Sequence, residues 1–188
     1  MAAKRMVIDG FGQLELNNVA FRRDGRVEAQ CKLDDTDFAT VPAENGMLLA
    51  VDNVNRTVKF ATDASLPIAL NYTAEHMYDE RKSALKDFKL ERGTFLPRLG
   101  YLAVGDKFTT NCLSYDSAKD SGWTDDSKVK EALTASALGT TPVYGGISAD
   151  GSILLSATKP TAGPVLLALP ATTMPDGQFG VKFQVLTA

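Results

Sequence analysis

The sequence predicts a mainly β fold, a barrel or sandwich of about ten short antiparallel strands with one short helical insert. Two observations lead to this prediction. Many short apolar runs are separated by turn residues, and Arg26–Leu33 alternates strictly between apolar and polar side chains, as a half-buried strand does. Asp-Gly pairs also stand between apolar runs at Asp24–Gly25, Asp150–Gly151 and Asp176–Gly177, and this dipeptide is typical of tight turns between strands.

The N-terminal part begins with a short basic arm, Met1–Arg5. A strand is expected over Leu14–Phe21, and Asp24–Gly25 would turn it into the strand Arg26–Leu33. The tip of this hairpin would carry three arginines, Arg22, Arg23 and Arg26. Such a tip is either an ordinary solvated turn or a dock for acidic groups of a partner.

Further short strands are expected at Met47–Val51, Thr57–Phe60 and Leu66–Tyr72, the last near a sheet edge because it contains Pro67. Thr73–Asp87 fits either a helix or an ordered loop, because polar residues interrupt its apolar stripe. His76 in this segment stands alone, without a partner pattern typical of catalysis.

The central element is expected to be a hairpin over Arg92–Asp116, with Gly105–Asp106 as its turn. The polar insert that follows contains a helix predicted at Lys128–Leu138, capped by Asp126 or Ser127. Trp123 in this insert is either a buried anchor, which we favour, or an exposed interface residue.

The C-terminal part returns to strands, with a hairpin joining Tyr144–Ser148 to Ser152–Ser156. Val165–Leu169 is apolar throughout, and Gly180–Leu186 alternates as a terminal strand that is expected at a sheet edge. These two runs predict self-association as a trimer or dimer. One domain is therefore expected, with a β core and arm at 1–116, the insert at 117–142, and strands at 143–188 that complete the core.

Composition narrows the function of this 188-residue chain. The net charge of −3 disfavours binding to nucleic acid as the main task. Two separated cysteines and one histidine disfavour a structural zinc site, and both thiols are expected to be free and buried. Because no signal peptide or membrane span is visible, a cytoplasmic site of synthesis is expected.

Motifs of catalysis and of cofactor binding are absent from the sequence: it contains no phosphate-binding loop, no dinucleotide fingerprint and no GxSxG motif. A glycosidase carboxylate pair is not excluded by spacing, because its two acids come from distant strands. The expectation is a protein without catalytic residues, cofactor or metal.

The segment GTFLPRLGYLAVGDKFTTN and the later TTMPDGQFGVKFQVL resemble small structural proteins encoded among the capsid genes of tailed bacteriophages. The resemblance covers at most half of the chain and leaves out residues 117–141. It implies a virion structural protein of the capsid decoration (cement) or head accessory type, a homo-oligomer that binds the major capsid protein and stabilises or decorates the shell. Arg22, Arg23, Arg26 and Trp123 are the candidate interface residues.

Two other functions fit a β-rich chain of this kind. One is a carbohydrate- or host-surface-binding module of a phage fibre, which needs exposed aromatic side chains. The other is a small glycan hydrolase, which needs a deep cleft with a perturbed carboxylate pair.

Overall fold

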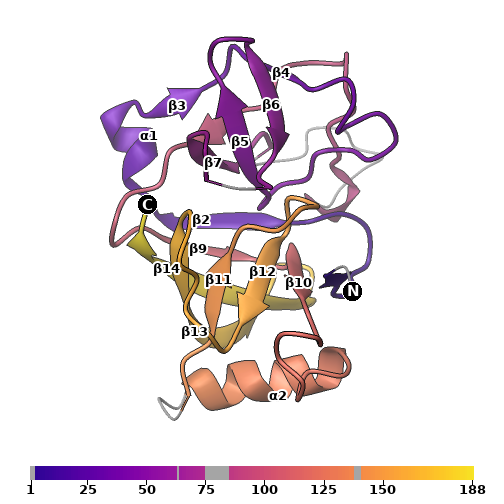
Figure 1. Cartoon of the computed structure of the whole chain (residues 1–188), viewed down its shortest axis with the longest axis vertical. Coiled ribbons are helices and arrows are strands. Elements are labelled where there is room, and N and C mark those ends of the chain that lie inside the picture. Colours follow the sequence, from indigo (N-terminus) through magenta and orange to yellow (C-terminus); the bar gives the residue numbers. More distant parts are fainter. Residues whose placement is uncertain (1–2, 63, 75–84, 138–140) are drawn as a thin grey trace.

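Two β-sheets stacked along the long axis form the molecule, as the computed structural model shows for residues 3–62, 64–74, 85–137 and 141–188 (Figure 1). The larger sheet has eight strands in the order β1-β10-β12-β11-β13-β14-β9-β2. Their bounds are β1 Lys4–Arg5, β2 Leu14–Asn18, β9 Lys107–Thr110, β10 Leu113–Tyr115, β11 Tyr144–Gly146, β12 Ile153–Ser156, β13 Val165–Thr173 and β14 Phe179–Thr187.

The smaller sheet has six strands in the order β3-β8-β7-β5-β6-β4. Their bounds are β3 Val27–Glu28, β4 Lys32–Leu33, β5 Leu48–Asp52, β6 Thr57–Phe60, β7 Ile68–Asn71 and β8 Leu99–Gly100. The described helices are α1 Ala20–Asp24, the 3₁₀ turn η1 Leu85–Asp87 and α2 Asp126–Ala137.

The predicted mainly β class is confirmed, in the form of a sandwich-like pair of sheets rather than a closed barrel. Both sheets are mixed, because β10 pairs with β12 and β4 pairs with β6 in parallel. The expectation of purely antiparallel strands is wrong in these two pairs. All four strands after residue 142 belong to the larger sheet, whereas strands before residue 117 contribute to both sheets.

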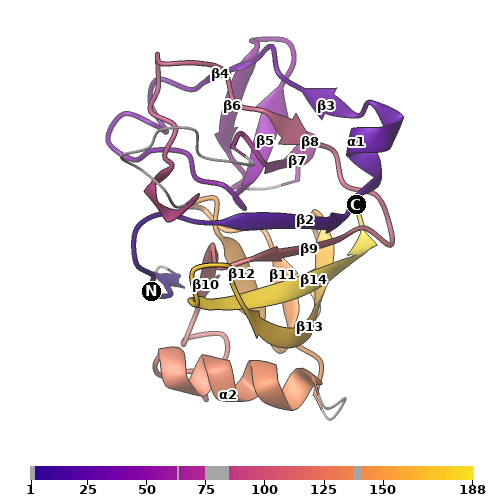
Figure 2. The ribbon, with the colours of Figure 1, turned by 180° about the vertical axis from the view of Figure 1, so that it is seen from behind.

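The buried apolar side chains form two clusters. The core of the larger sheet includes Phe108 and Phe183, whose ring centroids lie 5.8 Å apart, and it extends to Val129 and Leu133 of α2. The same cluster reaches across to Leu48 of β5 and Leu70 of β7, so it also joins the two sheets. Figure 2 shows α2 below this sheet, on the side away from the smaller sheet. The smaller sheet encloses a second cluster around Met47, with Cys31 and Cys112 among its buried members.

The predicted hairpin at Asp24–Gly25 is wrong. Residues 20–24 form the single turn α1, and Gly25 ends it in the left-handed conformation, with φ +70° and its N–H bonded to the carbonyl of Phe21. Phe21 is fully buried, and burying that ring requires the chain to turn inward before Gly25. An Asp-Gly pair serves a helix end as readily as a hairpin, because both use a residue with positive φ.

The expected strand Arg26–Leu33 is also divided, into β3 and β4. Between them, the Glu28 carboxylate accepts hydrogen bonds from the N–H groups of Gln30 and Cys31, at 2.6 and 3.1 Å. These bonds hold the chain in a local turn, so the alternating pattern does not continue as one paired strand.

The predicted central hairpin over Arg92–Asp116 is wrong as well. Before the turn, β8 pairs with β3 and β7 in the smaller sheet; after it, β9 pairs with β14 and β2 in the larger sheet. Gly105 therefore sits where the chain crosses between sheets. Asp106 fixes this crossing, because its carboxylate accepts from the N–H groups of Ala20 and Ala103, at 2.8 and 2.9 Å.

Two Asp-Gly hairpins are confirmed. Asp150–Gly151 joins the antiparallel pair β11 and β12, and Asp176–Gly177 joins the antiparallel pair β13 and β14. Together with Gly105, three of the four predicted turn glycines thus lie in strand-to-strand connections, and Gly25 instead follows α1.

The run Val165–Leu169 lies inside the larger sheet, between β11 and β14, and α2 packs against its strand. The expectation that Gly180–Leu186 lies at an edge is wrong, because β14 is paired on both sides, with β13 and β9. The helix prediction is nearly right, but Asp125 rather than Asp126 caps α2, by accepting from the N–H of Lys128 at 3.0 Å.

Candidate functional site

A buried ion pair ties the N-terminal strand to the seam between the sheets. Arg5 of β1 donates from Nη1 and Nη2 to the two carboxylate oxygens of Glu44, at 3.1 and 2.5 Å. The same carboxylate accepts from the N–H of Gly12 at 2.5 Å. The Glu44 side chain is 9% exposed and that of Arg5 is 27% exposed, so the pair is largely withdrawn from water.

Cys112 lies against this pair, with its Sγ 3.4 Å from Nη2 of Arg5. Burial raises the pKa of the Cys112 thiol to about 12, although the nearby Arg5 charge lowers it. A nucleophilic cysteine needs the opposite shift, because the thiolate is the reactive form. The arrangement is therefore structural, and the expectation that both cysteines are buried free thiols is confirmed.

This raised pKa predicts how stability depends on alkaline pH. A group whose pKa is higher in the folded chain adds stability that is complete below its unfolded pKa, about 9, and that is lost as pH rises toward 12. Between pH 8 and pH 10, wild-type protein is expected to lose about 1 kcal/mol more unfolding free energy than a Cys112→Ala variant. Urea melts at both pH values measure this difference, and parallel losses in the two proteins would refute it.

The three candidate arginines lie together around α1, but not at a hairpin tip. Arg22 and Arg23 are exposed in the last turn of α1, where cations favour the helix dipole. Asp24 partly neutralises the group, because its carboxylate lies 3.3 Å from Nε of Arg23 and 3.9 Å from Nη2 of Arg26. The surface is thus weakly basic.

Trp123 does not share that surface. Its side chain is 7% exposed and belongs to the core of the larger sheet, in the loop that leads into α2. The structure favours the anchor interpretation, in which the indole fixes the insert to the core. It leaves little indole surface for a partner.

An exposed apolar pair, Phe95 and Leu96, projects from the loop before β8, with 54% and 46% of these residues exposed. Two local contacts hold the loop in place. Thr94 Oγ1 donates to the Glu91 carbonyl at 2.6 Å, and the ring centroid of Phe95 lies 6.3 Å from that of Phe88. The predicted hairpin over Arg92–Asp116 places this pair inside a strand. The signal against that assignment is Pro97, because proline interrupts a strand ladder.

A hollow of about 310 Å³ adjoins this loop, lined by residues 38–42 and by Lys89, Glu91 and Arg92. A bridge between Ala43 and Leu90 holds its two sides together. Val41 on its rim is also exposed. We call residues 38–42, 89, 91, 92, 95 and 96 the docking face, because the segment that lines the hollow, with Arg92, continues along the chain into the exposed Phe95–Leu96 pair.

The remaining expectations concern metals, membranes and His76. The described ranges contain no group of His, Cys, Asp or Glu side chains placed to hold a metal ion. Among the same residues, no helix has the length and apolar character needed to cross a membrane. His76 lies outside the described residues. No family model, curated protein or solved structure matches this chain.

Proposed function

We propose that this chain is a virion structural protein that binds the surface of a tailed-phage capsid and reinforces the shell, acting by binding rather than by catalysis. The observation that carries the proposal is the exposed Phe95–Leu96 pair. It lies within GTFLPRLGYLAVGDKFTTN, the segment that resembles phage structural proteins. Aromatic and arginine side chains are the usual energetic centres of protein interfaces, and the docking face offers both.

The docking face suits a rigid protein partner. Its loop is held at Thr94 and again at Arg98, whose N–H donates to Thr73 Oγ1 at 3.0 Å, so little ordering entropy is lost on binding. Arg92 is already positioned by the Asp35 side chain, at 3.4 Å. In this proposal the partner is the major capsid protein, and the site of action is the virion.

A carbohydrate-binding module is the less favoured function. Among the described residues, Phe95 is the one aromatic residue that is more than half exposed, and a sugar platform generally needs several rings in one plane. A capsid surface, by contrast, needs one anchor and a complementary rim.

The proposal predicts that Phe95→Ser with Leu96→Ser weakens binding to capsid shells by about thirtyfold or more, because even one hot-spot side chain contributes about 2 kcal/mol. Co-sedimentation with shells assembled from the major capsid protein of the same genome measures the affinity. Val54→Ser is the matched control, because Val54 is 91% exposed and lies in the β5–β6 turn. Wild-type protein that does not bind, or a double variant that binds as wild type does, would overturn the proposal.

A second arm of this experiment tests the basic group around α1. If it meets acidic residues of the shell, Arg22→Ser with Arg23→Ser reduces both affinity and its salt dependence. Unchanged binding at low and high salt would remove α1 from the interface while leaving the docking face in place.

Self-association is part of the proposal, as a trimer or dimer at a symmetry axis of the shell. The sheet edge expected at β14 does not exist, because β14 is paired on both sides. The symmetry of a capsid shell is therefore the reason to propose self-association. The four edge strands β1, β2, β3 and β4 are short and carry charged residues, which discourages strand pairing between copies. Light scattering of the isolated protein and of the shell-bound form distinguishes contact between copies from binding as separate monomers.

A further inference from the structure

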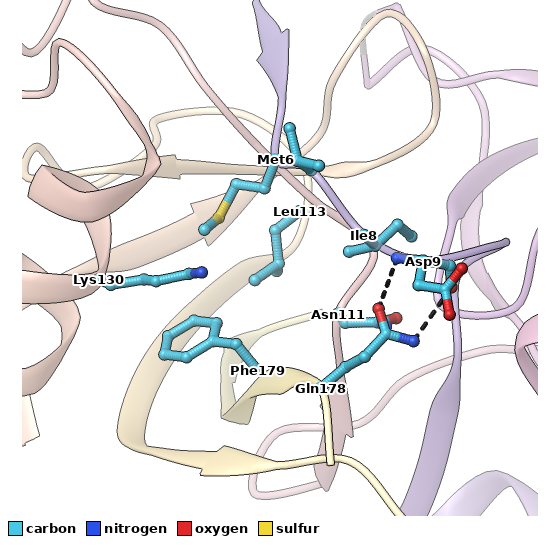
Figure 3. A pocket seen from close by; sticks show the side chains of 9 residues that line it. Met6, Ile8, Asp9, Asn111, Leu113, Lys130, Gln178 and Phe179 are labelled. Atoms are coloured by element: carbon cyan, nitrogen blue, oxygen red, sulfur yellow. Dashed lines mark hydrogen bonds between the residues drawn. The ribbon is translucent and has the colours of Figure 1, made fainter. Parts of the chain in front are cut away.

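A second hollow, of about 290 Å³, lies between the N-terminal segment, α2 and the start of β14 (Figure 3). Its walls are apolar where Met6, Leu113 and Phe179 line it. Met6 and Leu113 are buried members of the core, so these walls are fixed by packing rather than by surface side chains. The hollow is at the small end of the size range of ligand pockets.

One cation points into this apolar space. Figure 3 shows the Lys130 side chain extending from α2 between Met6 and Phe179, and its Nζ lies 5.2 Å from the centroid of the Phe179 ring. Among the described residues, Lys130 has no carboxylate within ion-pair distance. A cation held over a ring in a partly dry site favours an anion beside it.

A buried donor supplies the second observation. Asn111 lines the hollow and is 1% exposed. Its Oδ1 accepts from the N–H of Gln13 at 2.7 Å, which fixes the orientation of the amide. Its Nδ2 has no hydrogen-bond partner in the described chain, and such an unpaired buried donor is costly. Nδ2 is closed to solvent in this conformation, so a ligand oxygen in the hollow reaches it only after a small shift of the amide, and the hydrogen bond then formed removes this cost.

The other polar groups of the wall are already occupied. Gln178 accepts from the N–H of Asp9 at 2.7 Å and donates to its carbonyl at 3.0 Å, which holds the N-terminal segment over the hollow. The Asp9 carboxylate is bound by Lys86. The groups left for a ligand are therefore the ammonium of Lys130 and the Nδ2 donor of Asn111.

We propose that this hollow binds a small organic carboxylate with an apolar body. The carboxylate meets Lys130 and accepts a hydrogen bond from Asn111, and the body contacts Met6, Leu113 and Phe179. The proposal is independent of the capsid role, because the hollow shares no residue with the docking face.

The test uses benzoate and hexanoate as probes and titrates them into the full ¹⁵N-labelled chain. Saturable shifts are expected at the Asn111 side-chain amide and at residues 6–9 for at least one probe. Benzamide, the neutral counterpart of benzoate, is expected to bind at least about tenfold more weakly, because it lacks the charge that Lys130 recognises.

A matched pair of variants on α2 separates the pocket from general charge. Lys130→Met keeps the apolar stem and is expected to weaken carboxylate binding about tenfold, while Lys128→Met leaves it within about twofold. Lys128 is exposed and pairs with Glu131 at 2.9 Å, away from the hollow. Thermal melts check that both variants fold.

Three results would overturn the proposal. They are the absence of saturable binding for both carboxylates, equal binding of benzoate and benzamide, and a Lys130→Met variant that binds as wild type does. If Nδ2 of Asn111 binds only a water molecule and neither carboxylate binds, the first of these results has been obtained. The benzamide comparison needs no variant, so the test stands even if Lys130→Met does not fold.

Discussion

Arg5→Met is expected to lower the free energy of unfolding by about 2–3 kcal/mol, because it leaves the Glu44 carboxylate largely buried without its charge partner. A fully buried pair costs about 3–5 kcal/mol to break in this way, and the smaller figure allows for the partial exposure of Arg5. The pKa of Arg5 stays above its ordinary value: burial lowers it, but Cys112 and Glu44 together outweigh burial. Arg5 is thus charged at every accessible pH.

Urea unfolding measures this loss, with Lys32→Met as the matched control. Lys32 forms a surface pair with Asp35 at 3.1 Å, and both side chains are mostly exposed, so its loss is expected to leave the free energy of unfolding nearly unchanged. Glu44→Gln keeps an oxygen for the Gly12 N–H but removes the charge. In the Glu44→Gln background, Arg5→Met is therefore expected to lower the free energy of unfolding by less than it does in the wild type, and the difference is at least about 1 kcal/mol.

Equal costs of Arg5→Met in the two backgrounds would show that the charge pair contributes nothing beyond packing.

The location of the pair explains why it matters for the whole fold. Arg5 lies on β1, at the edge of the larger sheet, whereas Glu44 precedes β5 of the smaller sheet. Losing the pair removes a side-chain link between the sheets and leaves β1 attached to the larger sheet alone, by its pairing with β10.

The sequence predicted local turns better than it predicted which strands pair. Asp150–Gly151 and Asp176–Gly177 are hairpins because the strands on either side are adjacent in the same sheet. Gly105 and Gly25 also have positive φ next to an aspartate, but the chain leaves one sheet at each of them. Positive φ is encoded by the dipeptide itself, whereas the pairing partner depends on burial of distant residues such as Phe21.

The candidate functional sites show the same contrast between local features, which the sequence indicates, and long-range contacts, which it does not. Arginines near α1 were visible as a charge cluster, although their helical setting was not. The Arg5–Glu44 pair joins residues 39 positions apart, and no local pattern announces it. Asn111 likewise falls inside the predicted hairpin Arg92–Asp116 with no pattern that marks it, and only the packing around it leaves its amide donor unpaired. Contacts between residues so far apart in the sequence depend on the order of the strands in the sheets, and short sequence patterns in this chain did not predict that order.

Gly100→Ala is expected to lower the free energy of unfolding by about 3 kcal/mol, the upper end of the usual cost of overpacking. A Cβ at Gly100 would lie 2.5–2.6 Å from three ring carbons of Phe21, and a real contact of that length does not occur. The Phe21 ring has little room to retreat, because it is fully buried and its centroid lies 4.9 Å from that of Tyr72. Gly100 itself is held by β3 and β7 on either side.

Gly122→Ala is the matched control, because nothing lies within 4 Å of a Cβ at that position and its φ is not positive. It is expected to change stability by less than about 0.5 kcal/mol. Phe21→Leu offers relief, since a smaller side chain leaves space for the new methyl group. Gly100→Ala should then cost at least about 1 kcal/mol less in the Phe21→Leu background.

Additive costs of Gly100→Ala and Phe21→Leu would contradict this account, because independent sites share no contact. The expected coupling has a specific origin in the fold. The chain turns through α1 at 20–24 instead of forming a hairpin, and that turn carries Phe21 onto the bare backbone of β8. Gly100 thus provides the space in which α1 is fixed to the smaller sheet, and a single methyl group there acts on the connection between the two sheets.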